Sequence, residues 1–70
     1  MNLKDMEMMI IRYSALGYTD RETAAELKIS ESYVRWLLNN LFGKTYTKNK
    51  AHLVSWAYKN KVIGTEEKGE

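Results

Sequence analysis

The stretch GYTDRETAAELKISESYVR, residues 17–35, contains the start and stop signals of two short helices joined by a tight turn. Gly17 is the residue expected just after a helix, because it adopts positive φ without a Cβ clash. Thr19, followed three residues later by Glu22, forms the capping-box pattern that opens a helix. Ser30 is a good N-cap for the next helix. The stretch therefore predicts a helix over about residues 20–27, a turn of three or four residues, and a second helix from residue 31.

The remainder of the chain also follows the helical period, and no segment alternates with the two-residue period of a strand. We expect a first helix from about Lys4 or Asp5 to Leu16, with Met6, Met9, Ile10 and Tyr13 on one stripe. The third helix should end near Gly43 or Lys44, and a fourth should run from about Thr47 to Asn60 or Lys61. The predicted fold class is all-α, a four-helix domain over residues 1–63 with a disordered acidic tail over 64–70.

Composition limits the classes of function that are open to the chain. Seventy residues make one small domain. The chain has no cysteine and one histidine, His52, so it offers no ligand set for zinc, and we expect no metal, cofactor or small-molecule ligand. No nucleophile–histidine–acid set and no phosphate-binding loop is recognisable, which argues against an enzyme. With no long apolar run and no signal peptide, we expect a cytoplasmic protein without a membrane partner.

Charge is distributed unevenly along the chain. Residues 1–31 hold six acids against four cations, whereas residues 32–63 hold six cations and no acid. A long stretch that carries only positive charge can face a polyanion while the acidic first half faces water. An ordinary solvated basic face explains the same pattern, so charge alone does not decide.

A helical projection of the third helix separates a core stripe from an unusual outer face. Trp36 lies nearly opposite the core stripe, and Arg35 flanks it. Asparagine can bond adenine N6 and N7, arginine can bond guanine O6 and N7, and Trp36 could contact thymine methyl groups. Alternatively, Trp36 lies sideways over the first or second helix. The predicted core stripe is Val34, Leu37, Leu38 and Leu41, with Phe42 at its edge, and the outer face is Ser32, Trp36, Asn39, Asn40 and Gly43.

The same projection of the fourth helix suggests a second docking face. It places Trp56 outward, with Leu53 at the margin of the outer face. The natural reading is a homodimer contact, and the alternative is a lone tryptophan packed flat on its own helix. The predicted core side is Ala51, Val54, Ala57 and Tyr58, and the predicted dimer interface is Asn49, Leu53, Trp56 and Asn60.

On these residues the chain resembles the LuxR-type (GerE-type) helix-turn-helix, the DNA-binding output domain of many bacterial response regulators and quorum sensors. The likeness runs from Leu3 to Ile63 and is densest over residues 17–35, where the family pattern is Gly-x-Thr-Asn-Lys-Glu-Ile-Ala-x-x-Leu-x-Ile-Ser-x-x-Thr-Val-Lys. Further matches are Asn40, Leu41, Phe42, Lys44 and Ala57.

The resemblance implies roles for individual side chains. The positions that read bases in the family correspond to Arg35, Trp36 and Asn39 in this chain. In the family, the fourth helix is the dimerisation helix. The predicted DNA-backbone contacts, including neighbours of the family positions, are Thr19, Arg21, Ser30, Ser32, Tyr33, Asn40, Lys44 and Lys48.

The chain departs from the family pattern at four places. Leu37 replaces the usual histidine, Tyr33 replaces a threonine, and residues 44–47 replace a Lys-Leu-Gly-Val turn. Trp36 is unusual at a base-reading position. These changes affect sequence preference more than fold.

Two functions of different class follow. The first is a sequence-specific double-stranded DNA-binding transcription regulator, with residues 31–44 in the major groove, acting as a homodimer. The second is a protein-interaction module on the same fold, which binds a transcription factor or polymerase subunit through Tyr33 and Trp36. If the chain is complete, no receiver or ligand-binding domain precedes the first helix, and regulation comes through abundance, dimerisation or a partner.

Overall fold

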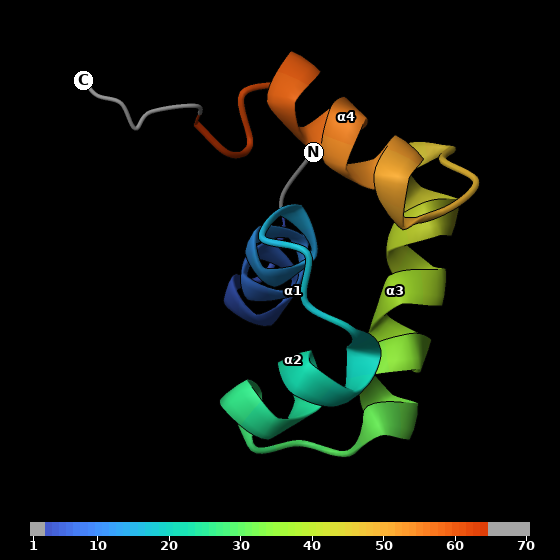
Figure 1. Cartoon of the computed structure of the whole chain (residues 1–70). Coiled ribbons are helices and arrows are strands. Elements are labelled where there is room, and N and C mark those ends of the chain that lie inside the picture. The colour runs from blue at the N-terminus through green and yellow to red at the C-terminus, as the bar shows by residue number, and fades with distance from the viewer. Residues whose placement is uncertain (1–2, 65–70) are drawn as a thin grey trace.

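The computed structural model describes residues 3–64 and contains four α-helices over that range (Figure 1). The all-α, four-helix prediction is confirmed. The predicted disordered tail lies, apart from Gly64, outside the described residues. The helices are α1 Asp5–Ala15, α2 Asp20–Leu27, α3 Glu31–Thr45 and α4 Lys50–Lys59.

The local signals at the turns act as predicted. Gly17 follows α1 with φ of 88°. The Thr19 hydroxyl oxygen accepts from the Glu22 N–H at 3.1 Å, and the Glu22 carboxylate accepts from the Thr19 N–H at 2.9 Å. The Ser30 hydroxyl oxygen accepts from the Tyr33 N–H at 3.0 Å, which caps α3. These bonds satisfy amides at the helix N-termini that have no partner within the helix.

The start of α4 was predicted about three residues too early. Asn49 is its N-cap, and the Asn49 side-chain oxygen accepts from the His52 N–H at 2.8 Å. Thr45 ends α3, and its hydroxyl donates to the Leu41 carbonyl at 2.7 Å. Tyr46 follows as the C-cap of α3, with a left-handed φ of 57°. The junction between α3 and α4 thus has capping bonds from its own side chains, Thr45 and Asn49.

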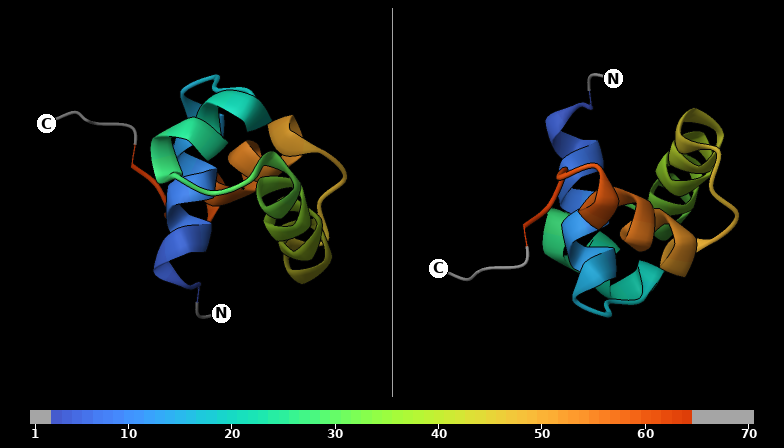
Figure 2. Two further views of the ribbon diagram at one scale, coloured as in Figure 1. Left: turned by 90° about the horizontal axis from the view of Figure 1, so that it is seen from below. Right: turned by 90° about the horizontal axis from the view of Figure 1, so that it is seen from above.

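The four helices are arranged so that one side of α3 faces solvent. In Figure 1, α2 lies beside the N-terminal half of α3, and α4 follows its C-terminal end. In both views of Figure 2, α4 lies between α1 and α3. Helix α1 contacts the other three helices. Three helices therefore support the inner side of α3.

The core is built around α3. All four predicted core residues of α3 are buried, and Ile10 and Ile11 of α1 are fully buried beside them. Burying a side chain of this kind stabilises the fold by about 1.5–3 kcal/mol. In α1, Met9 of the predicted stripe is exposed, whereas Ile11, which lies outside that stripe, is fully buried. The four α3 residues are Val34, Leu37, Leu38 and Leu41.

The projection of α4 is right at Ala57 and at Val54, which packs partly buried against the core, but wrong at Leu53, and this corrects the predicted dimer interface. Leu53 is fully buried, and Trp56 packs half-buried against the core. Ala51 and Tyr58, which were expected to face the core, are exposed, whereas Ala57 is buried as expected. The stripe of residues 49, 53, 56 and 60 exists, but its central part faces inward. Leu53 therefore has no surface to offer a second copy.

No helix in the described range is both long enough and apolar enough to cross a lipid bilayer.

Candidate nucleic-acid interface

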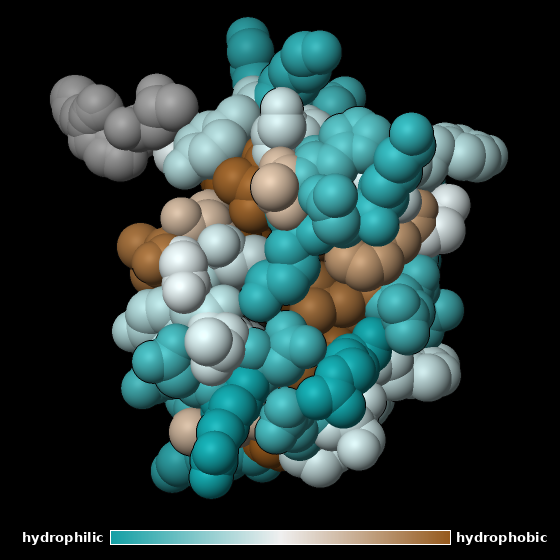
Figure 3. Space-filling model, turned by 45° about the vertical axis from the view of Figure 1, so that its right-hand side comes forward, coloured by the Kyte–Doolittle hydropathy of each residue, from teal (hydrophilic) through white to brown (hydrophobic). Residues whose placement is uncertain are grey.

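The outer face of α3 carries the residues that were predicted to read bases. Trp36 retains 59% of its surface and lies on the side opposite the buried Val34 stripe. Arg35, Asn39 and Asn40 are also exposed. Because most of its surface is accessible, Trp36 is not buried under α1 or α2. Figure 3 shows this side of the molecule, which is largely hydrophilic with a hydrophobic area in its middle.

Two aromatic rings form a stacked pair on this face. The ring centroids of Tyr33 and Trp36 are 5.8 Å apart with an interplanar angle of 20°. Tyr33 is itself 43% exposed. Residues three apart on a helix are neighbours, so the spacing could have predicted the pair. Two large aromatic groups that face solvent together form an apolar surface of the kind that a binding partner covers.

Arg35 is already engaged by carboxylates of the same chain. Its Nη2 lies 2.6 Å from the Glu31 carboxylate, and its Nε lies 3.6 Å from Asp20 Oδ2. Asp20 also accepts from Lys50 Nζ at 3.2 Å. An exposed ion pair of this kind contributes only about 0–1 kcal/mol. Arg35 can therefore exchange these partners for a phosphate or a base at small cost.

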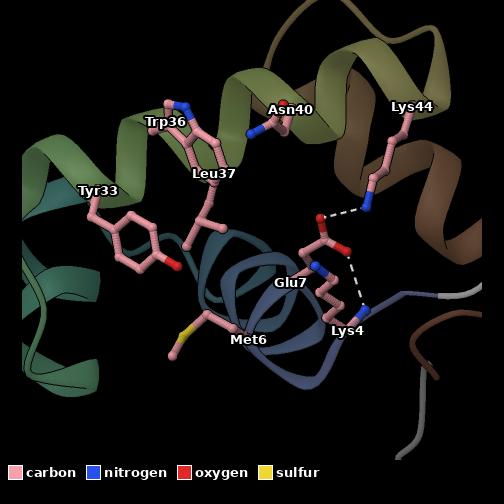
Figure 4. Close-up of a pocket in the computed structure, with 8 residues that line it drawn as sticks. All are labelled: Lys4, Met6, Glu7, Tyr33, Trp36, Leu37, Asn40 and Lys44. Carbon is pink, nitrogen blue, oxygen red and sulfur yellow. Dashed lines mark hydrogen bonds and ion pairs between the residues drawn. The ribbon is translucent and has the colours of Figure 1, made fainter.

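Lys44 forms a partly buried ion pair with Glu7, which sequence reasoning missed. Lys44 Nζ lies 2.7 Å from Glu7 Oε2, and Glu7 is only 4% exposed (Figure 4). The other carboxylate oxygen accepts from the Lys4 backbone N–H at 3.1 Å. The two partners are 37 positions apart in the sequence, so no local pattern predicts the pair. It ties the first turn of α1 to the last turn of α3.

Two opposing effects set the pKa of Glu7. Burial raises it, but the hydrogen bond from Lys44 lowers it, as do the Lys4 amide and the two lysine charges. The lowering effects win, and the pKa of Glu7 lies below its ordinary value of 4.5. The ionised form is therefore favoured in the folded protein more than in the unfolded chain.

Glu7→Gln should lower the free energy of unfolding at neutral pH by about 1–3 kcal/mol, because it removes a buried, charged acceptor. The sign of the pH effect follows from the lowered pKa. The contribution of Glu7 is present above the unfolded-state pKa and is lost as pH falls through the folded-state pKa. Denaturant unfolding of both proteins should show a difference in the free energy of unfolding at neutral pH, and this difference should shrink as pH falls below 4.5. Glu26→Gln, at an exposed site on α2, is the matched control. A difference in the free energy of unfolding that does not change with pH would contradict this account of Glu7.

A cavity of about 320 Å³ lies between the start of α1 and the flank of α3 that runs from the core residue Leu37 to Trp36. In Figure 4, the hydroxyl of Tyr33 points toward it from one side, and the Glu7–Lys44 pair closes the other side. The cavity thus adjoins the aromatic pair. Its lining is Lys4, Met6, Glu7, Tyr33, Trp36, Leu37, Asn40 and Lys44.

The other predicted backbone contacts lie at helix starts and in the α3–α4 segment. The hydroxyl oxygens of Thr19 and Ser30 accept capping bonds, and each hydroxyl keeps a hydrogen that it can donate to a phosphate. Arg21, Ser32 and Lys48 are exposed.

Asn49 and Asn60, the ends of the predicted dimer stripe, are exposed and bond within α4 or its flanks. Asn49 caps the helix, and the Asn60 side-chain amide donates to the Trp56 carbonyl at 2.8 Å. Within residues 3–64, no group of three or more His, Cys, Asp or Glu side chains could hold a metal ion.

Comparison with known proteins gives a family match over most of the chain. Residues 1–57 match the family described as bacterial regulatory proteins, luxR family. The chain is 40% identical over 58 residues to the CsgBAC operon transcriptional regulatory protein of Escherichia coli and to the probable csgAB operon transcriptional regulatory protein of Salmonella typhimurium. It is 34% identical over 62 residues to the probable transcriptional regulator ycf29 of Cyanophora paradoxa.

These relatives are longer proteins. The aligned regions cover 83–89% of this chain but only 27–30% of the length of the three relatives. The likeness therefore concerns less than a third of the length of each relative. The family match spans α1, α2, α3 and most of α4. The chain belongs to the luxR family of bacterial regulatory proteins.

Proposed function

We propose that the chain is a double-stranded DNA-binding transcription regulator that places α3 in the major groove. The observation that carries the proposal is the outer face of α3, where Trp36, Asn39 and Asn40 are exposed while the opposite stripe is buried. A major groove about 12 Å wide admits one α-helix. The relatives' names describe transcriptional regulators, and the luxR family match supports the same role for this chain.

The proposed roles divide by position on α3. Arg35, Trp36 and Asn39 contact base edges, and Arg35 leaves its carboxylate partners to do so. Lys44 contacts a phosphate through the same ammonium group that Glu7 binds from α1. The remaining proposed backbone contacts are Thr19, Arg21, Ser30, Ser32, Tyr33, Asn40 and Lys48.

Selection from a pool of random duplexes tests sequence-specific recognition. The protein should enrich a defined short motif, and a duplex with that motif should bind at least about tenfold more tightly than a scrambled duplex, because each mismatched base pair costs about 1–3 kcal/mol. Asn39→Ala should weaken binding to the motif with little effect on the scrambled duplex. Equal affinity for all sequences would contradict specific regulation.

We further propose a homodimer through the outer face of α4, in place of the predicted stripe. Ala51, Ser55 and Tyr58 are exposed on the side opposite the buried Leu53. The small side chains at 51 and 55 would let a second α4 approach closely. Pairing of two recognition helices about one DNA turn apart, roughly 34 Å, is the usual arrangement of dimeric helix-turn-helix proteins.

Sedimentation equilibrium tests the dimer. The wild type should shift from monomer to dimer mass as concentration rises, and Ala51→Glu should remain monomeric because two carboxylates would meet at the contact. Ala25→Glu, at an exposed position on α2, is a control of equal charge change. A wild type that stays monomeric at high concentration on its own and on DNA would overturn the dimer.

One observation favours the second function, a protein-interaction module. The exposed large hydrophobic groups on α3 are the aromatic pair, while Arg35 and Lys44 are held by carboxylates of the same chain. A protein partner would use the aromatic pair and leave the ion pairs in place. Absence of any duplex binding by the folded protein would favour this function over the first.

A further inference from the structure

The chemistry of the outer face of α3 narrows the base pairs that it can recognise. In the described structure, two kinds of group are available there without rearrangement. One is the Tyr33–Trp36 pair, which presents aromatic surface. The other is the pair of amides of Asn39 and Asn40, which are exposed and make no side-chain hydrogen bond within residues 3–64. Arg35, the group suited to guanine, is bonded to Glu31 at 2.6 Å.

Each of these groups has a preferred counterpart in the major groove. The thymine C5-methyl is the apolar group that natural bases present there, and the adenine N6–N7 edge fits a side-chain amide. An exposed tryptophan loses nothing by contacting a methyl group and gains from covering apolar surface. A cytosine or guanine edge at the same place would leave its polar atoms against an aromatic ring, without a hydrogen-bond partner.

The geometry favours a fixed reading surface over an adaptable one. Stacking at 5.8 Å restricts the rotamers of both rings before any DNA is present. Asn39 lies three residues beyond Trp36, so the amide and the indole project from the same side of α3. Consecutive base pairs along the groove could therefore meet the indole and then the amide.

We propose that the Tyr33–Trp36 pair reads thymine methyl groups in the major groove, so that the preferred site contains an A·T base pair, its thymine methyl against Trp36 and the adenine of the same or the next pair bonded to Asn39. The inference rests on the proposed function, and it names the substrate class of that site. Trp36 is the specificity-determining contact, and Tyr33 positions it.

The test replaces thymines by deoxyuridine, which pairs identically but lacks the methyl group. Binding of the whole chain to its selected duplex is measured by fluorescence anisotropy, with each thymine replaced in turn. At one or two positions the wild type should bind about fourfold more weakly, the effect of one methyl group removed from an apolar contact. In Trp36→Ala the same replacement should have no effect. Tyr46→Asn, at a 90% exposed aromatic residue beyond the end of α3, should retain the fourfold loss.

Three outcomes would overturn the inference, and they differ in what they say of DNA binding. A selected site that tolerates deoxyuridine at every position removes the thymine contact and leaves specific binding intact. An equal deoxyuridine effect in wild type and Trp36→Ala assigns the methyl contact to another residue. Salt-dependent binding to random duplexes without any selected motif removes base reading but keeps DNA as the partner, whereas no binding to any duplex overturns the proposed function itself.

Discussion

Leu53→Ala should unfold a large fraction of the protein at room temperature. Leu53 is fully buried between α4 and the rest of the core, and removal of a buried leucine side chain costs about 2–5 kcal/mol. A domain of this size has only about a few kcal/mol of stability, so the loss is of the same order as the whole. Circular dichroism against temperature should show a transition far below that of the wild type, or none.

The control for Leu53→Ala lies two residues away on the same helix. Ser55→Ala, at an exposed position, should change the free energy of unfolding by no more than about 0.5 kcal/mol. The two variants distinguish the buried position that Leu53 has in the structure from the outward position that the sequence-based interpretation gave it. A Leu53→Ala protein that is as stable as wild type, and loses only its tendency to associate, would return Leu53 to a dimer surface.

Trp36→Ala should have the largest effect on specific DNA binding while leaving the fold intact. The side chain is 59% exposed and lies outside the buried core, so its removal costs little stability. A base-contacting side chain contributes about 1–3 kcal/mol, and the affinity for the selected duplex should fall roughly 5- to 150-fold. Affinity for random duplexes, which depends on phosphate contacts, should change much less.

The comparison for Trp36→Ala is Lys48→Ala. Lys48 is an exposed cation in the segment between α3 and α4, and we propose that it contacts a phosphate. Its removal should weaken binding to all duplexes about equally. The proposed division of roles would be wrong if the two variants lowered specific and random binding in the same ratio.

Features with local causes could be predicted from the sequence. The α2–turn–α3 unit follows from Gly17, the Thr19–Glu22 capping box and Ser30, each of which acts within three residues of itself. The α3 face was predicted correctly because its large apolar residues occupy a single stripe. The exposure of Trp36 follows directly from that stripe.

Features that depend on distant partners could not be predicted. Helix α4 is apolar on several sides, so its sequence allows more than one inward face, and the buried Leu53 was assigned to the outside. Only the packing of α4 against α1 and α3 decides which of its faces points inward. The carboxylate of Glu7 looks like a solvated surface charge until Lys44 is brought beside it. The interaction of Arg35 with Asp20 likewise needs the packing of α2 on α3.

The central claim, that DNA is the partner, is tested most directly by fluorescence anisotropy on a random-sequence duplex at several salt concentrations. Each phosphate neutralised by a lysine or arginine contributes about −0.9 to the slope of log affinity against log salt. The account predicts a linear fall with a slope equivalent to several contacts, reduced by about one contact in Lys48→Ala. Absence of binding at low salt, by a protein that circular dichroism shows to be helical, would contradict it.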